Sequence, residues 1–144
     1  MVIGSVETLI QLAGECSGTI GQAMVKQEAA QQQIPEKDVL AQMEENWRIM
    51  KESIATGIQR PGRSKGGLIG GDGRKLYDYC HSDAELLAGA NVMEAVSYAL
   101  AVAEVNAAMG RIVACPTAGS CGIVPGVLKK IQELDHLTDG EIAM

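Results

Sequence analysis

The stretch 89-GANVMEAVSYALAVAEVNAAMG-110 decides how this sequence folds, because it is the most apolar part of the chain. It is long enough to cross a bilayer, but charged groups at mid-span cost several kcal/mol. We therefore expect a buried, central helix over about residues 90 to 109. The stretch contains two asparagines and two glutamates, and buried polar groups need partners, either on another helix or at the wall of a site. These residues are Asn91, Glu94, Glu104 and Asn106, and we expect the last three to be buried.

The composition supports a helical fold around that segment. The chain has 144 residues, enough for one domain, and 47% of them are hydrophobic. It has one Trp, three Tyr and no Phe, and few alternating runs of β-branched residues, so strands are not expected. We predict an all-α fold: a compact multi-helix domain with a central apolar helix and Gly-rich loops. The net charge of −6 disfavours a nucleic-acid partner, and the polar residues of the central stretch disfavour a membrane.

Capping and breaking residues predict further helices around the central one. Ser5 and Thr19 begin two of them, Gly57 is expected to end another as its C-terminal cap, and Ser82 with Glu85 forms a possible capping box. The expected helices cover residues 5–15, 19–33, 36–57, 75–81, a segment opened by 82-SDAELL-87, and 123–134.

A last helix start is predicted at 138-TDGE-141, three residues before the chain ends. Either this end frays, or residues 1–144 are part of a longer polypeptide or one subunit of a larger assembly, and we expect the latter. An exposed face that the remainder normally covers would favour self-association.

The segment 60-RPGRSKGGLIGGDGRK-75 is rich in glycine and cannot form a core. It is either a flexible linker or a loop whose backbone N–H groups and cations receive a small anion. Its spacing is not that of a P-loop.

The segment 114-ACPTAGSCGIVPG-126 places two cysteines in a loop of small and rigid residues. Cys121 lies at the expected start of a helix, where backbone N–H groups favour a thiolate. A thiolate there is a nucleophile, a redox centre or a metal ligand, and spacing alone does not separate these from a structural cysteine. We interpret Cys16, Cys80 and Cys115 as small hydrophobic residues. The start of the chain lacks a basic n-region, which predicts a cytoplasmic protein with reduced thiols or metal ligands.

Two of these segments make a family recognisable. The run 104-EVNAAMGRIVACPTAGSCGIVPGVL-128 and the loop 64-SKGGLIGGD-72 resemble the alpha chain of the bacterial iron–sulfur-dependent L-serine dehydratases, as do the helices around residues 20–30 and 40–54. The resemblance implies a lyase that converts L-serine to pyruvate and ammonia. It also implies that this chain corresponds to the N-terminal half of the alpha chain, inactive by itself, with the other half and a beta chain as partners.

The resemblance further implies a 4Fe–4S cluster held by three cysteines, with one iron acting as a Lewis acid on the β-hydroxyl of serine. Cys121 matches the first cluster ligand, the other two are expected outside this segment, and Cys115 is not a ligand. The family's base is expected in the beta portion rather than at His81 or His136. We expect four further residues to contact the substrate: Ser64, Lys65, Asp72 and Thr117.

Two other classes remain open from the sequence. One is a non-catalytic helical interaction module. The other is a thiol redox protein that uses Cys115 and Cys121, which would form a reversible disulfide in the isolated chain.

Overall fold

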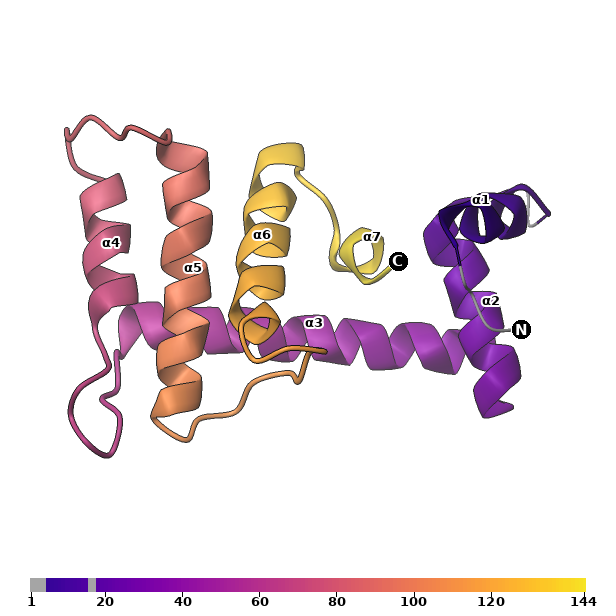
Figure 1. Cartoon of the computed structure of the whole chain (residues 1–144), viewed down its shortest axis with the longest axis horizontal. Helices are drawn as coiled ribbons and strands as arrows, with labels where there is room; N and C mark the ends of the chain where they lie inside the picture. The colour runs from indigo at the N-terminus through magenta and orange to yellow at the C-terminus, as the bar shows by residue number, and fades with distance from the viewer. Residues whose placement is uncertain (1–4, 16–17) are drawn as a thin grey trace. The chain divides into compact units, whose positions relative to one another are not determined.

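The computed structural model describes residues 5–15 and 18–144, and within them it contains seven helices and no strand (Figure 1). The prediction of an all-α fold is confirmed. The chain divides into two compact units, Met1–Glu45 with Asp139–Met144, and Asn46–Thr138. The long helix α3 (Glu36–Gln59) contributes residues to both units.

The first unit contains α1 (Val6–Glu15), α2 (Ile20–Gln32), the start of α3 and α7 (Asp139–Ala143). The helix expected over residues 19–33 is present, and it is capped at both ends. Thr19 Oγ1 accepts the Gln22 N–H at 3.2 Å, and the Gln22 side chain accepts the Thr19 N–H at 3.0 Å. Gln33 ends the helix in the left-handed conformation, with φ of 56°. A small apolar cluster joins α2 to α3; it consists of Val25, Ala29 and Val39, with Ile34 and Leu40 against it.

The second unit is built around α5 (Ala90–Ala107), which lies between α4 (Asp72–Cys80) and α6 (Ser120–Asp135) and contacts both (Figure 1). The core of this unit joins α5 to α3. Its buried members are Ile54, Ile58, Tyr98, Ala101 and Val102, with Tyr77 and Ile112 packed against them. The prediction of a central helix over this stretch is confirmed.

Glycines on three surrounding helices allow this central helix to be approached closely. A Cβ at Gly57 of α3 would lie 2.4 Å from the Ala101 carbonyl oxygen, and one at Gly73 of α4 would lie 2.7 Å from the Ala101 nitrogen. On α6, a Cβ at Gly126 would lie 2.7 Å from the Ala95 carbonyl oxygen. Small residues thus replace the bulky aromatic side chains that the sequence lacks, because the backbones themselves are in contact.

Four details of the sequence prediction are wrong. Helix α3 continues past Gly57 to Gln59, so this glycine is a contact residue and not a cap. Residues 82–87 form no helix, because the Ser82 hydroxyl donates to the Tyr79 carbonyl and accepts the Ala84 N–H within a turn.

The other two details concern helix ends and burial. Helices α4 and α6 each begin three residues before the expected position, at Asp72 and Ser120. Asn106 is exposed rather than buried, whereas Glu104 and Val105 beside it are buried, so Asn106 lies on the solvent side of the last turn of α5.

None of the helices in the described part of the chain combines the length and the apolarity needed to cross a membrane.

Candidate functional site

Three helix ends meet at one end of the second unit. The start of α4, the end of α5 and the start of α6 lie together, and the loops that precede α4 and α6 lie at this same end (Figure 1). The loop before α4 approaches the end of α5 at Gly62, where a Cβ would lie 3.2 Å from the side chain of Ala108, the C-cap of that helix. The glycine-rich segment and the cysteine segment therefore lie at the same end of the unit, and this end is the candidate site (Figure 1).

Glu104 fixes the glycine-rich loop to the central helix. Its side chain is only 4% exposed, and its carboxylate accepts the backbone N–H groups of Gly71 at 3.0 Å, Asp72 at 2.6 Å and Gly73 at 3.1 Å. These are the unpaired donors at the start of α4, where a negative charge is favourable. Gly71 has φ of 91°, a conformation that residues with a Cβ rarely adopt. The expected burial of Glu104 is confirmed, and its partner is a helix start.

The loop before α4 is held by its own hydrogen bonds. Ser64 donates its backbone N–H to the Ile69 carbonyl at 2.9 Å, and its hydroxyl accepts the Ile69 N–H at 3.2 Å. Lys65 is exposed, and exposed Asp72 pairs with Lys75 at 2.9 Å. Among these candidates, Ser64 therefore shapes the loop, while Lys65 and Asp72 are accessible to a ligand.

The loop before α6 is closed by Thr117 and Ser120. The Thr117 hydroxyl accepts the Ser120 N–H at 3.2 Å, and the Ser120 hydroxyl accepts the Thr117 N–H at 3.0 Å. This reciprocal pair satisfies backbone donors at the helix start and fixes the path of the chain there.

Cys121 is the second residue of α6, as expected for a thiol at a helix start. Its Sγ accepts the Cys115 N–H at 3.3 Å and lies 3.5 Å from the Thr117 carbonyl oxygen. Burial raises the pKa of the Cys115 thiol, and the neighbouring Cys121 sulfur adds to the increase. Cys115 is thus disfavoured as a thiolate, whereas Cys121 receives a backbone donor.

Cys80 does not join this group. Cys80 is half-buried rather than a core residue, and it ends α4, whose start lies at the candidate site. Burial and then the charge of Glu94 raise the pKa of its thiol, while Lys130 opposes them. Cys16 lies outside the described residues. Across residues 5–15 and 18–144, no three His, Cys, Asp or Glu side chains are grouped as a metal site.

A polar network that the sequence did not reveal joins α5 to α6. Lys130 pairs with Glu94 at 2.5 Å and with Glu133 at 3.7 Å. Tyr98 donates its hydroxyl to Glu133 at 3.2 Å. Burial lowers the pKa of Lys130, but the hydrogen bond and charge of Glu94, with Glu133, outweigh it and raise the pKa overall. Of these residues the sequence analysis had singled out Glu94, which is half-buried rather than buried and has its expected partner on another helix.

The described structure therefore gathers Thr117 and Cys121 in one loop, with Ser64, Lys65 and Asp72 in or beside the other. The hydrogen bonds of the first pair stay within residues 115–121. Sequence reasoning found both loops but did not find Glu104 as the link between α5 and the glycine-rich one.

Comparison with known proteins gives a consistent result. Residues 16–143 match the family described as Serine dehydratase alpha chain. The probable L-serine dehydratase alpha chain of Bacillus subtilis is 40% identical over 129 residues, which are 90% of this chain and 42% of that protein. The L-serine dehydratase of Streptomyces coelicolor is 36% identical over 128 residues, 85% of this chain and 26% of that protein.

The L-serine dehydratase alpha chain of Peptoniphilus asaccharolyticus is 26% identical over 127 residues, 88% of this chain and 43% of that protein. The chain thus spans about two fifths of the length of the curated alpha chains that it matches. No solved structure matches it. The family match covers most of the sequence, including both loops of the candidate site, and the chain belongs to the serine dehydratase alpha chain family.

Proposed function

We propose that this chain is the N-terminal part of the alpha chain of an L-serine dehydratase, a lyase that converts L-serine to pyruvate and ammonia. In this reaction serine loses its α-proton and its β-hydroxyl group, and the resulting enamine tautomerises and is hydrolysed. The observation that carries the proposal is the family match over residues 16–143, which includes the loop that holds Cys121 at a helix start.

We further propose that Cys121 is one ligand of a 4Fe–4S cluster whose other ligands lie outside this segment. The sulfur fits one ligand position, because it is half-buried at a helix start and accepts a backbone N–H. Such a cluster, when bound, would supply a Lewis-acidic iron for the departure of the β-hydroxyl group.

The residues of this chain have positioning and binding roles in the proposal. Thr117 and Ser120 hold the loop so that the start of α6 and the Cys121 sulfur face the same end of the unit. Thr117 lies in the same loop as Cys121, whose sulfur is 3.5 Å from the Thr117 carbonyl oxygen, and we assign Thr117 a contact with the substrate there. Lys65 and Asp72 are exposed and chemically suited to the carboxylate and the ammonium group, while Ser64 maintains the loop that carries Lys65.

The partners in this proposal are L-serine, the remaining part of an alpha chain and a beta chain. The general base is assigned to a partner. His81 follows the C-terminal end of α4 and His136 follows that of α6, so both lie away from the helix starts that form the site. The His81 Nδ1 is also within 2.8 Å of the Tyr77 carbonyl oxygen.

The assignment is tested by Cys121→Ala and Cys115→Ala in the complete enzyme, assembled anaerobically with the rest of the alpha chain and the beta chain. We expect Cys121→Ala to lose iron and serine turnover, because a cluster ligand is removed. Cys115→Ala should retain both. Unchanged iron and turnover in Cys121→Ala would refute the ligand assignment.

A thiol redox function is the second candidate, because the Cys121 sulfur lies 3.3 Å from the backbone nitrogen of Cys115. It predicts that the isolated chain forms a Cys115–Cys121 disulfide that a thiol reductant reverses. Mass measurement after oxidation and reduction separates the two functions, since a cluster ligand does not require this pairing.

A further inference from the structure

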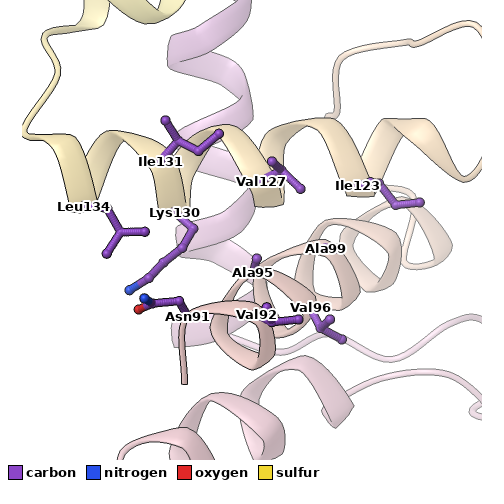
Figure 2. Close-up of a pocket in the computed structure, with 10 residues that line it drawn as sticks. All are labelled: Asn91, Val92, Ala95, Val96, Ala99, Ile123, Val127, Lys130, Ile131 and Leu134. Atoms are coloured by element: carbon purple, nitrogen blue, oxygen red, sulfur yellow. The ribbon is translucent and has the colours of Figure 1, made fainter. Parts of the chain in front are cut away.

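An apolar groove runs between α5 and α6 (Figure 2). One wall carries Val92 and Val96 of α5, which are 55% and 40% exposed. The other carries Val127 and Ile131 of α6, which are 43% and 39% exposed. The spacing of four residues on each helix makes these walls regular, and Ala95 and Ala99 lie between them.

The groove continues toward the candidate site. A second hollow shares Val96, Ala99 and Ile123 with the first and extends to Ala118 and Gly119. The continuous surface therefore reaches the loop that precedes Cys121. Two antiparallel helices with small residues between them form the kind of surface on which the side chains of a third helix pack.

We propose that this groove is the docking site for a helix from the remaining part of the alpha chain, with one end of that helix beside the Cys121 loop. The inference rests on the proposed function in taking this chain as a part of an alpha chain. It adds the place where the rest of that chain binds.

The length of the relatives favours this occupant. This chain spans 42% and 43% of the two alpha chains compared above, so most of each of those proteins lies outside the match. The apolar character of the groove also favours a permanent neighbour, because permanent interfaces resemble a domain core while transient ones are more polar. A partner that docks along the groove also reaches the loop at which Cys121 needs further ligands.

The test uses the complete 144-residue chain, tagged and co-expressed with the parts of the Bacillus subtilis alpha chain that lie outside its match. We expect the two polypeptides to purify together in equal amounts. Docking should slow amide hydrogen exchange in α5 and α6.

Three lysine substitutions locate the contact. Val127→Lys and Val96→Lys each place a charge on one of the two opposite walls of the groove. Each should lower the amount of co-purified partner at least tenfold. Val124→Lys is the matched control, because Val124 lies on α6 and is 38% exposed but does not line the groove. Circular dichroism checks that each variant is folded, and the two walls give independent results.

Three outcomes would overturn the proposal. The first is that the unsubstituted chain retains no partner, the second is that both groove variants retain as much partner as the unsubstituted chain, and the third is that Val124→Lys loses as much partner as the groove variants. A dimer of this chain that Val127→Lys dissociates would assign the groove to a second copy instead. The assay needs neither iron nor serine, so Cys121→Ala should dock like the unsubstituted chain. Docking can therefore be observed even if the proposed serine dehydratase chemistry is absent, so a failure of the docking proposal is distinguishable from a failure of the proposed function.

Discussion

Replacing Gly57 by alanine tests whether direct backbone contact holds the second unit together. The new Cβ would lie 2.4 Å from the Ala101 carbonyl oxygen and 2.7 Å from the Ala101 Cβ, whereas such contacts essentially never fall below 3.0 Å. Helices α3 and α5 must therefore separate by at least ~0.6 Å at this point. The separation loosens the core on either side of the contact, including Ile54 and Val102.

The expected loss of stability follows from two opposing effects. Overpacking a filled interior costs about 1–3 kcal/mol, and a clash with backbone that cannot rotate away belongs at the upper end of that range. Alanine in place of glycine inside a helix returns about 1 kcal/mol. We therefore expect Gly57→Ala to lower the free energy of unfolding by about 2 kcal/mol.

Urea unfolding followed by the fluorescence of Trp47 measures this change. Trp47 is the single tryptophan of the chain, is 2% exposed and belongs to the same unit as Gly57. Gly66→Ala is the control, because nothing lies within 4 Å of the new Cβ and the φ of Gly66 is not in the left-handed region. Its effect should stay within about 0.5 kcal/mol. Equal stabilities of the two variants would refute the reasoning.

Two further predictions concern buried polar groups. Glu104→Ala leaves three backbone donors at the start of α4 without their acceptor. Each unpaired donor costs about 1–3 kcal/mol, and less where water enters. We therefore expect the free energy of unfolding to fall by about 3 kcal/mol. Glu104→Gln keeps one carbonyl oxygen and should lose less in urea unfolding; equal losses would contradict the capping role. Burial, with the charge and hydrogen bond of Glu133, raises the pKa of Tyr98, so the folded chain retains this proton to higher pH than the unfolded chain, and stability falls as pH rises above about 10. Tyr98→Phe should flatten that fall above about pH 10; identical slopes would show that Tyr98 contributes nothing.

Local chemistry was sufficient to predict most of the helices. The helix expected from residue 19 forms α2, and the structure shows that it begins with a capping box of Thr19 and Gln22, which is complete within four residues. The apolar stretch around Tyr98 indicated the central helix, because a helix that is apolar on nearly every face is normally buried. The position of Cys121 at a helix start was also readable from the turn residues before it.

The sequence alone therefore determined the helical class, the central helix and the two loops of the candidate site. Tertiary structure decided the role of Gly57, the acceptor that Glu104 provides for the start of α4, and the apolar groove between α5 and α6. Each of these depends on groups that are distant in the chain and become neighbours only after folding. Glu104 and Asp72 are separated by 32 positions, and no local pattern encodes which donors a buried carboxylate will meet. A contact between two helices requires both surfaces, whereas a cap or a turn is complete within a few residues.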